Sequence, residues 1–219
     1  MPVLERTRAK AHELNDDVLP HPGRRMTEDE FVAWCTGKTK AEWVDGEVII
    51  MAPASGEHVD FAWFLMTIMR EYAEEKDLGL VRGTEFFVRL RGVDGKIRRR
   101  IPDILFVAKS RLHILRPNHA EGAPDLVVEI VSKESTARDW RDKYLDYQAA
   151  GVREYWVVDP LSKKVEAYSL GRDKKYRLIV EQAGIIRSGI LAGFFLKPAW
   201  LWPGRLPRAR QVLRELGVG

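Results

Sequence analysis

The chain has 219 residues, of which 45% are hydrophobic and 31% are charged, so it can bury an ordinary core and is neither disordered nor a coiled coil. The net charge of +4 permits an anionic partner without requiring one. The single cysteine, Cys35, excludes an intrachain disulfide and a thiolate-rich metal site. We find no secretory signal and no apolar run near the roughly 20 residues of a membrane span, so we expect a cytoplasmic protein without membrane contact.

The first half of the chain predicts an arm, a short helix, a hairpin and a long helix. Residues 1–25 are polar and contain Pro20 and Pro22, so we expect an N-terminal arm before one domain over 26–219. Thr27 and Glu30 form a capping-box pattern that predicts a helix through Trp34. The Asp45-Gly46 dipeptide predicts a hairpin within 41–53. Apolar residues at helical spacing predict a helix over 58–75, which Gly79 closes.

The second half predicts strands that alternate with one helix. We expect strands over 80–91, 96–101, 103–107, 125–131 and 155–159, a hairpin over 165–170 and 176–180, and helices over 135–150 and 207–216. Residues 108–124 are irregular, and a loop of that length is often functional. Hairpins and strand–helix–strand units together predict one α/β domain with a mixed sheet.

A carboxylate lies in the middle of the most apolar predicted strand. Leu126 to Val131 are apolar on both faces apart from Glu129, as in a central strand buried on both sides. A buried carboxylate is costly unless it is protonated, paired or bound to a cation. A structural ion pair with an arginine is the alternative explanation for Glu129.

A second acid and a lysine repeat this pattern. Pro102 precedes Asp103, which opens the apolar strand that ends at Val107; a turn aspartate is the alternative. Lys143 follows in the next helix, beside the inward face that Tyr147 helps to mark. Spacing alone leaves two readings of Lys143 open: a group that leans over the strand end, or an exposed i, i+4 partner of Asp139.

Taken together, these motifs resemble a known family. The carrying segments are Glu42-Trp-Val-Asp-Gly-Glu47, Pro53 and His58, Pro102-Asp103, Pro124-Asp-Leu-Val-Val-Glu-Ile-Val-Ser132, Asp139 and Lys143, and Gly151-Val-Arg-Glu-Tyr-Trp-Val-Val-Asp-Pro160. In this order they resemble the Uma2 family, the DUF820 group, of the PD-(D/E)XK nuclease superfamily, over residues 27–202. The resemblance implies a restriction-endonuclease-like core, with a central mixed sheet flanked by helices and an N-terminal β-hairpin extension.

The resemblance also assigns roles. Asp103 and Glu129 would bind Mg²⁺ or Mn²⁺, and Lys143 would assist the attacking water. The superfamily's usual lysine lies two residues after the second acid, where this chain has Val131. Glu47 is the preferred fourth catalytic group, with Glu42 and His58 as accessory candidates. Cross-strand charges on a hairpin are the alternative for the two glutamates, and a helix N-terminal cap residue is the alternative for His58.

A basic run precedes Pro102 along the chain. Arg98, Arg99 and Arg100 would lie near the site by connectivity and could contact phosphates, which gives affinity without sequence specificity. The alternative is a solvated hairpin edge.

The expected function is therefore a metal-dependent endonuclease that acts on nucleic acid, with DNA as the expected substrate. The alternative is an inactive nuclease-fold module that binds nucleic acid or regulates. No nucleophile-elbow, phosphate-loop or His-Glu-x-x-His motif points to another hydrolase. We also expect a homodimer, for which the apolar segment 194–202 offers a surface unless that segment completes the core.

Overall fold

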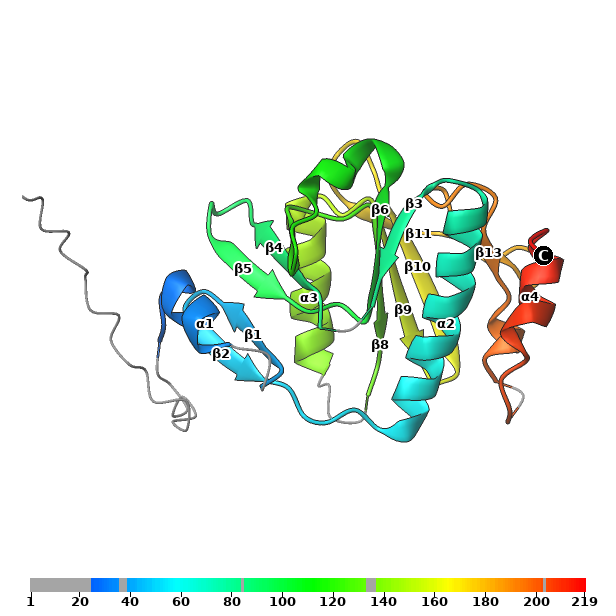
Figure 1. Ribbon diagram of the computed structural model, residues 1–219, viewed down its shortest axis with the longest axis horizontal. Helices are drawn as coiled ribbons and strands as arrows, with labels where there is room; N and C mark the ends of the chain where they lie inside the picture. The colour runs from blue at the N-terminus through cyan, green and yellow to red at the C-terminus, as the bar shows by residue number, and fades with distance from the viewer. Residues whose placement is uncertain (1–24, 36–38, 84, 133–136, 203) are drawn as a thin grey trace, which may run out of the picture.

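The structure is a computed structural model that describes residues 25–35, 39–83, 85–132, 137–202 and 204–219, with the backbone alone for 137–140 (Figure 1). The expected arm at 1–25 lies outside these residues except for Arg25. The α-helices are α1 (Glu28–Trp34), α2 (Gly56–Glu75), α3 (Ala137–Ala150) and α4 (Ala209–Glu215). Two short 3₁₀ helices, η1 (Lys109–Ile114) and η2 (Pro198–Trp200), complete the helical elements of the described chain.

A mixed sheet forms the centre of the protein, in the strand order β11-β10-β9-β8-β6-β3. Its strands are β3 (Gly79–Arg82), β6 (Ile104–Ala108), β8 (Leu126–Ile130), β9 (Glu154–Asp159), β10 (Lys164–Leu170) and β11 (Tyr176–Leu178). Strands β8 and β9 are parallel and are connected through α3, whereas the other pairs are antiparallel. Helix α2 covers one face and α3 the other (Figure 1). The fold is therefore the mixed sheet flanked by helices that the sequence predicts.

A second sheet carries the N-terminal hairpin, in the order β2-β1-β5-β4-β7. Its strands are β1 (Ala41–Val44), β2 (Glu47–Ile50), β4 (Phe87–Arg91), β5 (Ile97–Arg100) and β7 (His119–Glu121). Asp45 and Gly46 both have positive φ, at 52° and 93°, as a tight hairpin turn requires. The predicted capping box at Thr27 and Glu30 is confirmed at the start of α1.

The structure refines one prediction and shows that two others are wrong. The strands expected over 80–91 are β3 and β4, which belong to different sheets. The expected loop over 108–124 contains η1 and β7, because its short polar segments pair with other parts of the chain. Helix α2 ends at Glu75 with Lys76 as its C-cap, so Gly79 does not close the helix but begins β3.

The apolar segment near the C-terminus completes the core. Phe194, Leu196 and Leu201 are buried in the cluster beneath α2, and the short pair β12 (Ile186–Arg187) and β13 (Phe195–Leu196) holds the segment in place. The burial of these side chains favours the alternative that 194–202 completes the core, and the homodimer stays a prediction. No helix among the described residues is long and apolar enough to span a membrane.

The close contact between β3 and β6 depends on Gly79. A Cβ atom at this position would lie 2.2 Å from the carbonyl oxygen of Val107, and the backbone φ is +153°. We expect Gly79→Ala to lower the free energy of unfolding by roughly 2 kcal/mol, measured by urea denaturation.

Gly95 is the matched control, because its φ is also positive, at +76°, but a Cβ atom there would meet nothing within 4 Å. Gly95→Ala should therefore cost less than Gly79→Ala. Equal losses would show that backbone strain, and not the clash with β6, is what matters at Gly79.

Candidate active site

The central sheet brings two carboxylates together at one end. Ile104 is paired with Val128 across the antiparallel strands β6 and β8, so Asp103, just before β6, is the neighbour of Glu129 near the end of β8. The Oδ2 atom of Asp103 accepts a hydrogen bond from the backbone N–H of Ile130 at 2.8 Å. Both carboxylates line a cleft of about 240 Å³. The two acids that the sequence singles out therefore share one site.

Glu129 is held by two side chains of α3. Its Oε2 atom accepts from Lys143 Nζ at 2.9 Å, and its Oε1 atom accepts from the hydroxyl of Tyr147 at 2.7 Å. Lys143 and Tyr147 are four residues apart and so lie on one face of the helix. Burial raises the pKa of Glu129 to about 7, and the charges of Asp103 and Glu42 act in the same direction, although Lys143 opposes them.

Lys143 leans over the strand end instead of pointing into solvent. Besides Glu129 it lies 3.4 Å from Oε1 of Glu42, and its side chain is only 12% exposed. Burial alone would lower the pKa of Lys143, but the three nearby carboxylates of Glu129, Glu42 and Asp103 outweigh burial and raise it. Lys143 is therefore a cation at neutral pH. The side chain of Asp139, its other candidate partner, lies outside the described residues.

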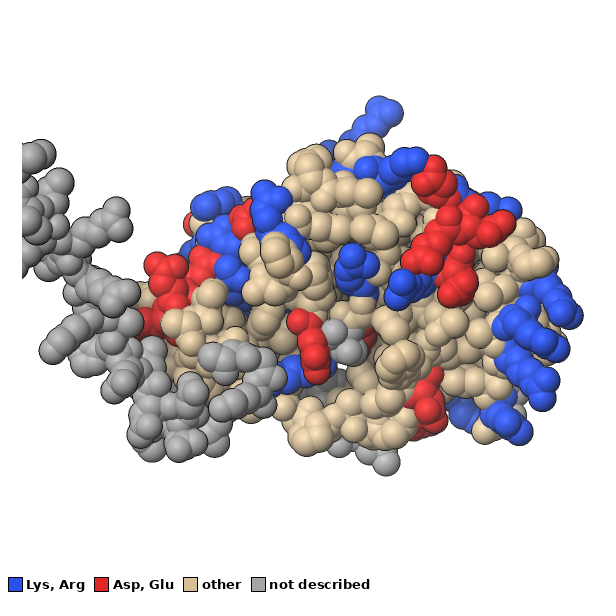
Figure 2. Space-filling model, in the orientation of Figure 1, with Lys and Arg blue, Asp and Glu red and all other residues tan. Residues whose placement is uncertain are grey.

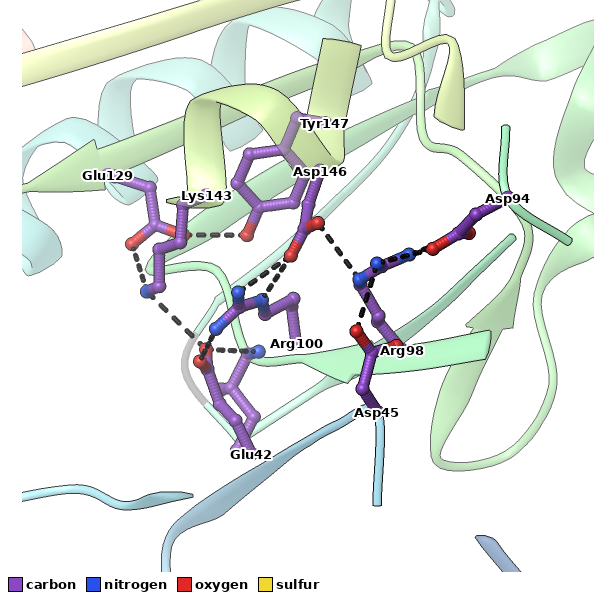
Figure 3. A network of polar contacts seen from close by, with 10 residues as sticks. Glu42, Asp45, Asp94, Arg98, Arg100, Glu129, Lys143, Asp146 and Tyr147 are labelled. Atoms are coloured by element: carbon purple, nitrogen blue, oxygen red, sulfur yellow. Dashed lines mark hydrogen bonds and ion pairs between the residues drawn. The ribbon is translucent and has the colours of Figure 1, made fainter. Parts of the chain in front are cut away.

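Glu42 joins the site from the hairpin. It is buried on β1, where Oε1 accepts from the backbone N–H of Ile101 at 3.0 Å and Oε2 accepts from Arg100 at 2.8 Å. Burial would raise the pKa of Glu42, but Lys143 and Arg100 lower it below its usual value. Figure 3 shows Glu42 between the lysine of α3 and the arginine of β5. Glu42 therefore links the small sheet to the catalytic candidates.

His58 lies on the other side of Asp103. Ser55 is the N-cap of α2, so His58 does not have the cap role that was its alternative. Its Nε2 atom lies 3.0 Å from Oδ1 of Asp103, and its Nδ1 atom is buried with no hydrogen-bond partner among the described residues. The hydrogen bond to Asp103 raises the pKa of His58 despite its burial. In return, His58 and Lys143 hold the pKa of Asp103 below its usual value, against the effect of burial.

The structure does not bring Glu47 to this cluster. Glu47 is paired with Val44 at the turn end of the hairpin, whereas Glu42 is paired with Ile49 farther from the turn. The Glu47 side chain is 62% exposed and contacts Arg25. Glu42, and not Glu47, is therefore the hairpin glutamate in contact with Lys143, and the identity of a fourth catalytic group stays a prediction.

The arginines of the basic run form ion pairs within the protein. Arg98 contacts Asp94, Asp45 and Asp146, and Arg99 contacts Glu28. Arg100 is buried between Glu42 and Asp146, at 2.8 Å and 2.6 Å (Figure 3). Phosphate contact by these three arginines stays a prediction, and their observed partners are carboxylates.

Sequence reasoning did not assign a role to three residues near the site. Tyr147 binds Glu129, Asp146 binds Arg100, and the hydroxyl of Tyr155 is buried beside the cleft with no hydrogen-bond partner among the described residues. A signal existed for Tyr147, because it lies one helical turn after Lys143. No such signal existed for Asp146, because its partner Arg100 lies on β5 of the small sheet, far away in the sequence.

The donor set fits a hard cation with few protein ligands. Asp103 and Glu129 offer carboxylate oxygens at one cleft, and Ile130 and Val131, which follow Glu129, line the same cleft. No group of three or more His, Cys, Asp or Glu side chains within the described part of the chain is arranged to enclose a metal. Mg²⁺ commonly uses one or two carboxylates together with water and substrate phosphates, so two acids are sufficient.

The fold and this pair of strand-end acids define a restriction-endonuclease-like protein. The sequence profile of the Uma2 family, described as "Putative restriction endonuclease", matches residues 28–197, and the chain therefore belongs to the Uma2 family. A solved structure described as "a putative nuclease belonging to DUF820" from Anabaena variabilis ATCC 29413 has a similar fold, with a TM-score of 0.68 and 18% identity. The match covers 81% of this chain and 97% of the other. No curated protein matches the chain.

The raised pKa of Glu129 predicts a pH-dependent stability. The folded protein keeps a proton on Glu129 up to about pH 7, whereas an exposed glutamate releases it near pH 4.5. Over this pH range the folded state therefore binds more protons than the unfolded state. The stabilisation that Glu129 contributes in this way is fully present below about pH 4.5 and is lost as the pH rises to about 7.

Glu129→Gln has no carboxyl to titrate. In metal-free buffer we expect its free energy of unfolding, relative to that of the native sequence, to rise across this pH window and then level off. Chemical denaturation at a series of pH values measures this difference. Parallel pH profiles for the two proteins would contradict the assigned environment of Glu129.

The different environments of Glu42 and Glu47 are also testable. Glu42→Gln removes a buried charge that contacts both Lys143 and Arg100, so we expect a loss of roughly 3 kcal/mol in the free energy of unfolding. Glu47→Gln alters an exposed residue and should change it by no more than about 0.5 kcal/mol. Urea denaturation of both variants decides the point, and similar losses would place Glu47 in the network after all.

Proposed function

We propose that this protein is a metal-dependent endonuclease that hydrolyses phosphodiester bonds of nucleic acid, with DNA as the expected substrate. Asp103 and Glu129 hold Mg²⁺ or Mn²⁺, and Lys143 assists the attacking water. The single observation that carries the proposal is the convergence of these three side chains at one cleft. Membership of the Uma2 family supports the reaction class.

The two carboxylates must be ionised in order to bind a metal ion. A divalent cation bound there supplies charge neutralisation at the phosphate and a nucleophilic water. His58 and the Ile130 N–H favour the charged form of Asp103. Glu129 is protonated below about pH 7, and it must lose that proton to act as a ligand, so activity should rise through this pH range.

Lys143 acts as a hydrogen-bond donor and a positive charge. A lysine whose pKa is raised keeps its proton at neutral pH and cannot serve as a general base. An ammonium group has three N–H donors. One donates to Glu129 at 2.9 Å, and Glu42 is an ion-pair partner at 3.4 Å, so a further N–H can orient water or stabilise negative charge on the phosphate. Glu42 is a positioning residue, because it acts through Lys143.

Exposed arginines at the C-terminal end of the chain are candidates for phosphate contact. Figure 2 shows basic side chains gathered at the end of the molecule that carries α4, where Arg208, Arg210 and Arg214 are exposed. Elsewhere on the face in this figure, acidic and basic groups are interspersed. These arginines would add affinity without sequence specificity.

The proposal predicts that Lys143→Ala lowers the rate of cleavage by roughly a hundredfold or more, because charge stabilisation in the transition state is lost. Single-turnover cleavage of labelled DNA and RNA with Mg²⁺ or Mn²⁺ measures the rate, and circular dichroism checks the fold. Lys133→Ala is the control, since Lys133 is the nearer lysine along the chain after Glu129.

Two results would revise this account. Loss of activity in Lys133→Ala but not in Lys143→Ala would move the catalytic lysine. Absence of cleavage by the native protein, combined with binding of nucleic acid, would favour the alternative of an inactive nuclease-fold module, which the lack of a lysine at Val131 keeps open.

A further inference from the structure

Helix α2 exposes a tryptophan on the side opposite its core contacts. Trp63 is 63% exposed, whereas its neighbours Phe64 and Leu65 are buried under the helix. Val59, one turn earlier, is also exposed, at 39%. An exposed indole contributes nothing to the core, and large exposed apolar side chains that cluster often mark a binding surface.

Trp63 lines a second cavity, which opens beside the active-site cleft. This cavity has a volume of about 470 Å³, and Val59, Pro53 and Met66 form apolar parts of its wall. Lys40, His58 and Asp103 line both cavities. We call this second cavity the apolar lobe. Because it shares these three residues with the active-site cleft, it adjoins the cleft at Asp103.

Polar groups lie where the two cavities meet. Lys40 provides a positive charge, and the Nδ1 atom of His58 is buried with no hydrogen-bond partner among the described residues. A buried polar atom without a partner costs free energy unless a ligand or water satisfies it. The cavity lined by Trp63 thus combines an exposed indole, apolar walls, the ammonium group of Lys40 and the carboxylate of Glu85, next to the candidate active site.

We propose that this lobe binds an unpaired nucleobase of the strand being cut, stacked on Trp63, with the adjoining phosphate directed towards Asp103. The inference rests on the proposed function and specifies its substrate class. A base inside a continuous duplex is covered on both faces by its neighbours, so only an unstacked base can present its face to the indole. The enzyme therefore prefers single-stranded or locally opened nucleic acid.

A nucleotide fits the lobe better than a second copy of the chain. The surface is hollow, and Lys40, His58 and Asp103 line it, so a protein partner seated there would bury the charge of Lys40 and close the cleft. A base with its phosphate matches both the apolar wall and the cation.

The test measures binding separately from cleavage. Asp103→Asn serves as the non-cleaving parent, and fluorescence anisotropy gives its affinity for a short single-stranded oligonucleotide and for the matching duplex. Trp63→Ala, Trp63→Phe and Val180→Ala are added to this parent. Val180 is the control, because it is 69% exposed and follows β11 at the edge of the central sheet.

We expect Trp63→Ala to weaken single-strand binding by roughly 5- to 150-fold, the range for one base stacked on an aromatic ring. Trp63→Phe should retain part of the affinity, and Val180→Ala should retain all of it. In a series of oligonucleotides that each lack one base at a different position, one oligonucleotide should bind the parent more weakly by the same factor. Trp63→Ala should not weaken the binding of that oligonucleotide further.

Other outcomes overturn the proposal. Unchanged single-strand affinity in Trp63→Ala, or an equal loss at every position that lacks a base, would exclude a stacking site. If light scattering shows that Trp63→Ala instead dissociates a dimer, the surface joins two copies. If the parent binds neither the single strand nor the duplex, the proposed function fails as well. If the parent binds nucleic acid but Trp63→Ala has no effect, only the inference about Trp63 fails.

Discussion

The site depends on the contact between Glu129 and Lys143, which becomes an ion pair once Glu129 ionises near pH 7. A carboxylate near the end of a central strand, covered on both sides, is unfavourable without a counter-charge, and Lys143 supplies it from the helix that follows the strand. Val131 occupies the position where a lysine two residues after Glu129 would lie. The connection from β8 through α3 to β9 returns the helix across the same strand, so a lysine on the inner face of α3 reaches the same carboxylate.

The ion pair also explains how the small sheet is attached to the core. Glu42 contacts Lys143 and Arg100, and Arg100 continues to Asp146 on α3, so one chain of charges connects β1, β5 and α3 (Figure 3). A buried charge that loses its partner is strongly destabilising, which couples the position of the hairpin to the geometry of Lys143. The geometry of the candidate site and the docking of the two sheets therefore depend on the same residues.

Much of the site was predictable because its signals are local. Glu129 interrupts an apolar strand, Asp103 follows a proline at a strand entry, and Lys143 lies beside a helix face, all of which can be read from short segments. The choice between Glu42 and Glu47 could not be made in this way, because both lie on one hairpin and only the docking of that hairpin distinguishes them. The same limit explains the division of the strands over 80–91 between two sheets and the inward use of the basic run, whose carboxylate partners are distant in sequence.

The central claim is that Asp103 and Glu129 hold one divalent cation beside Lys143. Crystals soaked in Mn²⁺ above pH 7, where Glu129 is ionised, allow the ion to be located by its anomalous scattering. The account predicts one peak about 2.2 Å from a carboxylate oxygen of each acid, with Lys143 still in contact with Glu129. A peak bound to only one of the two acids, or no peak in this cleft at a Mn²⁺ concentration that supports cleavage, would contradict it.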